Sequence, residues 1–212
     1  MMDMQEPSAL KISGVKRIHG RAVLTLSNGE ALSMPRAMLR ERPYKSGMPF
    51  DRAAFDVFIR EHSYAFALEK AVALLASRAR TEKEIVDALQ KNAYPEVTIA
   101  RVMARLHEAG YINDADFAAQ WAAARTSKGM GMRRIRMELR QKGVDQTQID
   151  QTLTEVDEDE WLSGALKAAQ KAARGKDLSS PADRQKIIAA LARRGYDFSI
   201  ARKALNALIE SE

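Results

Sequence analysis

One sequence pattern occurs three times in this chain of 212 residues, and it constrains the fold more than any other feature. Each copy places an isoleucine four positions before a leucine within a charged segment of about ten residues. Because residues four apart share one face of an α-helix, each pair predicts the buried side of a helix. A recurrence at roughly 50 residues predicts a tandem array of helical repeats. The pairs are Ile85 and Leu89, Ile135 and Leu139, and Ile187 and Leu191.

Each copy also carries the signals of further helices. Four residues after each leucine stands Ala93, Gly143 or Gly195, a position that typically closes a helix in the left-handed conformation. A second helix follows each time, anchored by Ile99, Ile149 or Ile200. An earlier helix precedes each copy, at 69–78, 114–125 and 158–174. Three units of three helices are therefore the simplest prediction.

The first fifty residues differ from the repeats. Short β-prone segments cover 10–15, 22–25 and 31–34, separated at His19-Gly20 and by the turn Ser27-Asn28-Gly29-Glu30. Asn-Gly between such segments indicates a hairpin, because both residues tolerate positive φ angles. We predict a small hairpin or three-stranded meander that packs on the helices, followed by a connector at 40–49 that contains Pro43, Gly47 and Pro49.

The predicted fold class is all-α, with three tandem three-helix repeats in an elongated curved array and a small N-terminal β-hairpin or meander. Residues 1–50 form the extension and connector, 51–112 a lead helix and the first repeat, 113–156 the second repeat, and 157–212 the third. Thr81 and Glu84 form a capping-box pattern, and Asn113 is placed to cap the following helix. Residues 128–132 and 175–180 are predicted to be flexible joints.

The net charge of +6 favours polyanions or acidic protein surfaces as partners. Seven basic residues and only Glu138 lie between Arg125 and Lys142. Arg133, Arg136 and Arg140 share a helical face, and we count no acidic partners at i+4 within the segment 125–142. Both a cationic binding stripe and an ordinary solvated face fit this pattern. The candidate partner-binding residues are Arg133, Arg134, Arg136, Arg140, Lys142, Arg193 and Arg194.

Nothing in the sequence predicts an enzyme, a cofactor or a metal site. The absence of cysteine excludes disulfides, thiolate catalysis and the common zinc sites. The three histidines have no ligand or nucleophile at motif spacing, and the glycine-rich segment 128–132 lacks the phosphate-loop pattern. No apolar segment is long enough to span a membrane, and the start lacks the layout of a secretion signal, so we expect a cytoplasmic protein.

The few aromatic residues are predicted to be structural. Phe117 and Trp121 lie four residues apart on one helix, and Trp161 is expected to have a similar role in the third repeat. We predict that all three anchor the core, and that Tyr111 and Tyr196 lie at its edge rather than stacking on nucleic-acid bases.

Three segments together resemble the RecX family. The first combines Arg78-Ala79-Arg80-Thr81-Glu82-Lys83-Glu84-Ile85 with Leu106-His107-Glu108-Ala109-Gly110-Tyr111-Ile112-Asn113-Asp114. The second is the basic segment 133–143, and the third covers 184–196. The resemblance spans about 69 to the C-terminus, with its motifs in the family's order.

The resemblance implies a non-catalytic, monomeric regulator that binds the filament of the RecA recombinase on DNA. Members of the family typically lie in the groove of that filament and restrain its ATPase and strand exchange, whereas some members enhance recombinase action. Some also bind single- or double-stranded DNA directly. The candidate arginines would then contact acidic RecA side chains or filament DNA. An independent helical protein that grips DNA phosphates without reading sequence is the alternative prediction.

Overall fold

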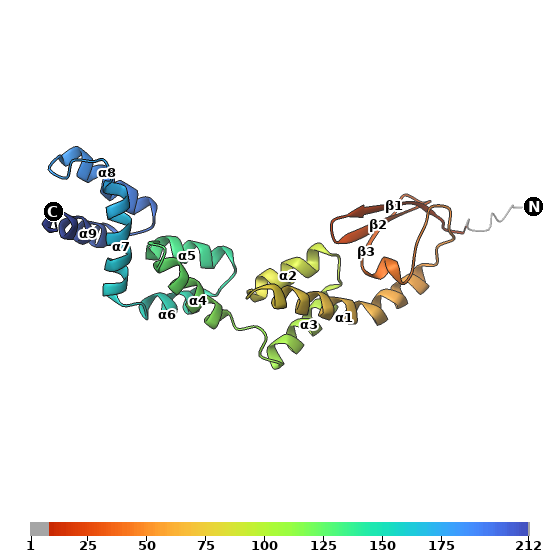
Figure 1. Cartoon of the computed structure of the whole chain (residues 1–212). Coiled ribbons are helices and arrows are strands. Elements are labelled where there is room, and N and C mark those ends of the chain that lie inside the picture. The colour runs from red at the N-terminus through yellow and green to blue at the C-terminus, as the bar shows by residue number, and fades with distance from the viewer. Residues whose placement is uncertain (1–8, 212) are drawn as a thin grey trace, which may run out of the picture. The chain divides into compact units, whose positions relative to one another are not determined.

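The structure is a computed structural model that describes residues 9–211, and the chain divides into two compact units between Ile112 and Asn113. The first unit contains β1 (Ile12–Ile18), β2 (Arg21–Leu26), β3 (Ala31–Pro35), the 3-10 helix η1 (Met38–Arg40), α1 (Arg52–Ser77), α2 (Glu82–Lys91) and α3 (Glu96–Glu108). The second contains α4 (Asp114–Thr126), α5 (Met132–Gln141), α6 (Gln146–Thr154), α7 (Glu158–Ala173), α8 (Pro181–Arg193) and α9 (Phe198–Glu210) (Figure 1). The predicted fold class, in which three-helix repeats follow a small N-terminal sheet in the sequence, is confirmed.

The three strands form an antiparallel meander in the order β1-β2-β3, as predicted. Alternate residues of β2 are buried, namely Ala22, Leu24 and Leu26, because successive side chains of a strand point to opposite faces. This face packs against the start of α1, where Phe55 contacts the rings of Tyr44 and Phe50 (Figure 1). The sheet therefore shares its core with the helix that begins the first repeat.

The lead helix and the first helix of the first repeat are one continuous helix. The sequence predicted a helix that starts at Glu69, but α1 runs for 26 residues from an Asp51 cap. Its first half packs under the sheet through Phe58 and Ile59, and its second half buries Ala67 and Ala71 in the repeat. No proline or glycine interrupts the segment, so nothing local ends the helix between the two cores.

The repeated isoleucine and leucine pairs form the centres of the three triplets. All six side chains are fully buried, at 0% exposure. The closing positions Ala93, Gly143 and Gly195 all have positive φ angles, of 64°, 85° and 93°. In each case the next backbone N–H donates to the carbonyl oxygen of the repeat's leucine, at 3.1 to 3.2 Å. This is the Schellman-type ending predicted from the spacing.

The glycine-rich segment before α5 is a packed contact between the second and third repeats, and the prediction of a flexible joint there is wrong. The Gly131 N–H donates to the carbonyl oxygen of Arg194 at 2.9 Å, and the Arg133 N–H donates to that of Gly195 at 3.0 Å. A Cβ atom on Gly131 would lie 2.3 Å from the backbone of Gly195. Glycine is therefore needed here for close approach of two backbones, not for flexibility.

The α7–α8 connection is also held by specific contacts, contrary to the predicted joint. Leu178 is 6% exposed and belongs to the core of the second unit. Its carbonyl oxygen accepts a hydrogen bond from Arg184, and the backbone N–H of Asp177 donates to the carboxylate of Asp183 at 3.2 Å. The longer loop thus adds an apolar anchor to the third repeat.

A substitution of Gly131 by alanine tests the close packing of these two repeats. We expect Gly131→Ala to lower the free energy of unfolding by about 1–3 kcal/mol, as overpacking does, because the new methyl group overlaps the Gly195 backbone. Urea unfolding followed by circular dichroism measures the change. Gly14→Ala is the matched control, since its nearest neighbour would be 4.0 Å away. Equal stability of the two variants would contradict the role of Gly131.

Candidate partner-binding surface

The basic helix α5 has its charges placed against the helix dipole. Ile135 and Leu139 bury one side, and the first turn carries Arg133 and Arg134 with no acidic residue and no side-chain cap. The N-terminus of a helix has a partial positive charge, so two arginines there cost stability and attract anions. This placement supports the interpretation of α5 as a binding element more than that of an ordinary solvated face.

The structure brings four of the predicted arginines to one place. The backbone hydrogen bonds from Gly131 and Arg133 seat the start of α5 against the α8–α9 turn, which carries Arg193 and Arg194. Arg133 and Arg193 are exposed, and neither forms an ion pair with any of the residues 9–211. We call Arg133, Arg134, Arg193 and Arg194 the arginine junction.

Two members of the arginine junction also have partners inside the protein. The Arg134 Nε donates to Glu138 at 3.1 Å, and the Arg194 Nη1 lies 3.4 Å from the carbonyl oxygen of Gly129. The expectation that this helix has no acidic partner at i+4 is therefore wrong, since Arg134 and Glu138 form such a pair. The pKa of Asp197, whose carboxylate caps α9, is lowered mainly by the hydrogen bond from the Ile200 backbone N–H, and Arg133 adds to this effect.

The side chain of Glu138 connects α4 and α5. It is 14% exposed and accepts hydrogen bonds from Trp121 Nε1 at 3.0 Å and from Arg125 Nε at 2.8 Å, in addition to the bond from Arg134. Burial raises the pKa of this carboxyl group, but the three donors outweigh it and hold the pKa below its ordinary value. Glu138 is thus a structural anion within the basic segment.

Two cations lie over the ring of Trp121, next to its hydrogen bond with Glu138. The guanidinium carbon of Arg125 and the ammonium nitrogen of Lys142 each lie 4.3 Å from the centre of its ring. Its ring also stacks on Phe117, with centroids 5.6 Å apart. Phe117 and Trp161 are buried as predicted, and Trp121 is partly buried beside them. Lys142 is therefore held against α4 rather than extended beside the arginine junction.

Arg136 and Arg140 lie farther along α5 and contact α6. Arg136 Nη2 pairs with Asp150 at 2.9 Å, and its Nε is buried without a hydrogen-bond partner among the residues described. Arg140 Nε donates to Gln146 at 2.7 Å, and Gln146 in turn donates to Asp150. The shared face predicted from the i, i+3, i+7 spacing exists, but these two arginines connect helices within the second repeat.

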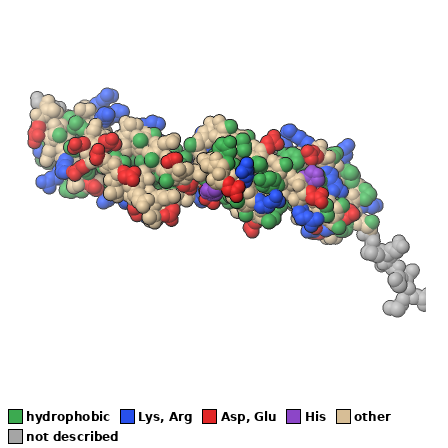
Figure 2. All heavy atoms as spheres, turned by 90° about the horizontal axis from the view of Figure 1, so that it is seen from below, with side chains coloured by type: hydrophobic (Ala, Val, Ile, Leu, Met, Phe, Trp, Pro, Cys, Tyr) green, Lys and Arg blue, Asp and Glu red, His purple; other side chains and the backbone are tan. Residues whose placement is uncertain are grey.

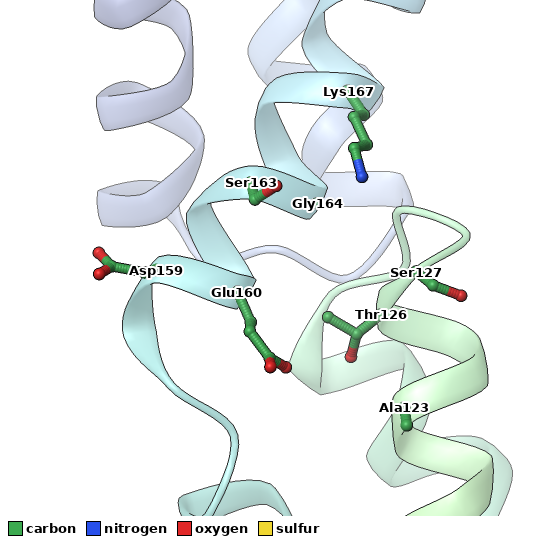
Figure 3. Close-up of a pocket in the computed structure, with 8 residues that line it drawn as sticks. All are labelled: Ala123, Thr126, Ser127, Asp159, Glu160, Ser163, Gly164 and Lys167. Atoms are coloured by element: carbon green, nitrogen blue, oxygen red, sulfur yellow. The ribbon is translucent and has the colours of Figure 1, made fainter.

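An open groove lies between α4 of the second repeat and α7 of the third repeat. Its volume is about 470 Å³, and small residues such as Ala123, Ser163 and Gly164 form its floor. Figure 3 shows Glu160 and Lys167 extending into the space between the two helices, while Asp159 points away. The polar side chains of its lining are those of Thr126, Ser127, Asp159, Glu160, Ser163 and Lys167.

The remaining candidates for chemistry are dispersed. No group of three His, Asp or Glu side chains in residues 9–211 could hold a metal ion. His107 contacts Glu82 and His62 contacts the Phe58 carbonyl oxygen, both on the exposed surface. Tyr196 is 3% exposed, and Tyr111 is 65% exposed, so the prediction of a core-edge position is wrong for Tyr111. No helix in this part of the chain is long and apolar enough to cross a membrane.

Acidic and basic side chains alternate over much of the surface. On the face that Figure 2 shows, Lys and Arg side chains lie between Asp and Glu side chains in both units. Exposed cations without an ion pair among residues 9–211, such as Arg133 and Arg193, therefore stand out from this pattern. Together with the fold, the arginine junction defines a class: a protein of tandem three-helix repeats with a cationic surface where two repeats meet.

Three family descriptions match the three triplets in order. They are RecX, first three-helix domain, at residues 67–106; RecX, second three-helix domain, at 113–153; and RecX, third three-helix domain, at 158–205. The chain belongs to the RecX family, and the resemblance predicted from the sequence is confirmed. The sheet and the first half of α1 lie outside the segments that match the family.

Relatives and solved structures agree with this assignment. The regulatory protein RecX of Mycolicibacterium vanbaalenii is 36% identical over 147 residues, which are 66% of this chain and 80% of the relative. That of Bacillus velezensis is 32% identical over 205 residues, which are 94% and 76% of the two chains. A crystal structure of regulatory protein RecX has a TM-score of 0.64 at 24% identity and covers 93% of this chain and 99% of that one. The structure of RecX from Lactobacillus salivarius has a TM-score of 0.65 at 21% identity, with 70% and 97% covered.

The role of Glu138 gives a pH-dependent prediction. We expect Glu138→Gln to lower the free energy of unfolding by about 1 kcal/mol at pH 7, because charge-assisted hydrogen bonds to three donors are weakened. The folded-state pKa is depressed, so this stabilisation is present above the unfolded pKa of about 4.3 and is lost as the pH falls through the folded pKa. Wild type and variant should therefore become equally stable in acid.

Urea unfolding between neutral pH and about pH 3 measures this difference across the titration of a carboxyl group. Glu155→Gln, at an exposed position in the same repeat, is the control and should change nothing. A difference between wild type and Glu138→Gln that persists undiminished in acid would mean that the glutamine perturbs packing rather than charge.

Proposed function

We propose that this protein is a non-catalytic regulator that binds the RecA–DNA filament and restrains its ATPase, its strand exchange and its growth. Membership of a family named as regulatory supports the coarse role. The arginine junction carries the finer proposal. Its cations come from two repeats, and the two backbone segments that hold them are hydrogen-bonded to each other. Such a surface suits acidic side chains or phosphates that recur along a polymer.

The internal partners of the candidate arginines favour some of them over others as the proposed contact. Binding through Arg133 and Arg193 costs little reorganisation, because neither has to leave an ion pair within the described chain. Arg136 would have to leave Asp150, and Arg140 would have to leave Gln146. We therefore place Arg133 and Arg193 at the centre of the contact, with Arg134 and Arg194 beside them and Arg136, Arg140 and Lys142 at its border.

A second candidate function is non-specific DNA binding that needs no RecA. The excess of basic residues favours it, since phosphate contacts give affinity without reading bases. The two functions differ in stoichiometry. A protein that acts on a filament can inhibit well below one copy per RecA, because one bound molecule affects neighbouring subunits. A competitor for DNA inhibits only when it covers the DNA, and its effect weakens steeply with salt.

The DNA-dependent ATPase rate of RecA, with this protein titrated in, tests the proposal. Wild-type protein should inhibit at substoichiometric ratios. The double variant Arg133→Glu/Arg193→Glu should need about tenfold more protein for the same inhibition, since reversing charges at an interface introduces like-charge repulsion. Its circular dichroism spectrum should match wild type, because both side chains are exposed.

The matched control is Lys171→Glu/Arg174→Glu, which reverses two exposed charges on and just after α7. It should inhibit within about twofold of wild type if the contact is local rather than a general effect of charge. An equal loss of inhibition in both double variants would show that the arginine junction is not the contact. Inhibition that appears only at saturating doses and follows DNA coverage would favour the second candidate function.

A further inference from the structure

A second cationic feature lies in the first unit, in a cleft between the N-terminal sheet and the first repeat. Three basic side chains line this cavity of about 200 Å³, namely Arg36, Arg40 and Lys70. Arg36 directly follows β3, Arg40 ends η1, and Lys70 lies on α1. The other lining residues are Gly20, Ala37, Asn92 and Tyr94. None of the described residues that line the cleft carries a carboxylate.

The walls of the cleft are fixed by backbone contacts. The Arg36 N–H donates to the Gly20 carbonyl oxygen at 2.9 Å, which joins the end of β3 to the β1–β2 turn. Gly20 packs directly against Asn92 at the end of α2, and a Cβ atom there would lie 1.6 Å from the Asn92 Oδ1. Asn92 is itself held by a bond from its Nδ2 to the Ala88 carbonyl oxygen at 2.6 Å. The sheet and the repeat thus meet in one defined geometry.

The three cations of the cleft lack acidic partners. None of them forms an ion pair with any of the residues that the structure describes. The nearest carboxylates flank a neighbouring hollow of about 340 Å³, where Glu41 and Glu69 share the walls with Arg40 and Lys70. Convergence of unpaired cations costs free energy through mutual repulsion, and an anion placed between them removes that cost.

The segment that carries the sheet is itself rich in basic residues. Between Ala9 and Phe50 the chain has eight lysine and arginine residues and two glutamates. Arg17 and Arg21 are exposed on the strands that flank the turn containing Gly20. A ligand with several negative charges in succession fits this distribution better than a single anion does. A cavity of about 200 Å³ has room for a phosphate group.

We propose that this cleft binds phosphate groups of a nucleic-acid strand, with Arg36, Arg40 and Lys70 as the contacts. Arg36 and Arg40 supply planar guanidinium groups that can each donate two hydrogen bonds to phosphate oxygens, and Lys70 adds a compact charge. The contacts address the backbone alone, so the binding is indifferent to base sequence. This site goes beyond the regulation proposed above, because it needs neither RecA nor the arginine junction, and it gives the second candidate function, DNA binding without RecA, a defined place in the first unit.

The test compares two triple variants of the full chain. Arg36→Ala/Arg40→Ala/Lys70→Ala removes the cations of the cleft. Arg60→Ala/Lys83→Ala/Arg105→Ala removes the same charge from exposed positions elsewhere in the unit. Binding of a fluorescein-labelled oligodeoxythymidylate is followed by anisotropy from about 50 to 200 mM salt, where phosphate contacts weaken measurably.

The cleft variant should bind the oligonucleotide about tenfold or more weakly at low salt, and its salt slope should fall by about two, as the loss of three single-strand phosphate contacts predicts. The control should stay within about twofold of wild type, since it keeps those contacts. Unchanged binding by the cleft variant, or equal weakening of both, would overturn the proposal. Tighter binding of a labelled polyglutamate peptide than of the oligonucleotide at the cleft would overturn it too.

A third probe separates two sources of phosphate. Calorimetry with inorganic pyrophosphate should show binding to wild type that the cleft variant alone loses. If wild type bound pyrophosphate in this way but no oligonucleotide, the phosphate chemistry would stand and the ligand would be a small phosphorylated compound. Because RecA is absent from all these measurements, their failure leaves the proposed regulation untouched. Failure of the ATPase test likewise leaves this cleft untouched.

Discussion

The second unit depends on a contact between two backbones. Gly195 has to satisfy two constraints there at once: its φ of 93° closes α8, and its missing side chain lets the start of α5 approach. A Cβ atom at this position would lie 2.4 Å from the Arg134 nitrogen. In the first repeat only the first constraint applies, and Ala93 occupies the corresponding position with a φ of 64°. The left-handed turn belongs to every repeat, whereas the close approach belongs to the place where two repeats meet.

Local patterns were enough to predict the fold, because each triplet is specified by its own sequence. The spacing of Ile135 and Leu139 gave the buried face of α5, and the glycine four residues later gave its end. The Asn-Gly turn gave the meander in the same way, since Gly29 has the positive φ that the turn requires. Each of these signals lies within about ten residues of the structure it determines.

What the sequence could not provide depends on partners that are far apart in the chain. Gly131 suggested flexibility because nothing nearby in the sequence shows that residue 195 packs against it. The ion pair between Arg136 and Asp150 crosses from α5 to α6, so it is absent from any pattern along one helix. The ion pair between Arg134 and Glu138, by contrast, could have been predicted, since the two residues are four apart on one helix. The cleft in the first unit was beyond prediction, because it joins the sheet, η1, α1 and α2.

The arginine junction rests on hydrogen bonds between main-chain atoms, and this has an evolutionary consequence. Main-chain donors and acceptors are the same for almost every residue type, so the seating of α5 on the α8–α9 turn requires glycine at two positions and does not depend on the side chains of Arg133 and Arg193. Selection can therefore replace the side chains at 133 and 193 without altering how the two repeats dock, whereas Arg134 and Arg194 also bond to Glu138 and Gly129. Lineages whose partners differ in surface charge could retune recognition here by single substitutions while inheriting the same scaffold.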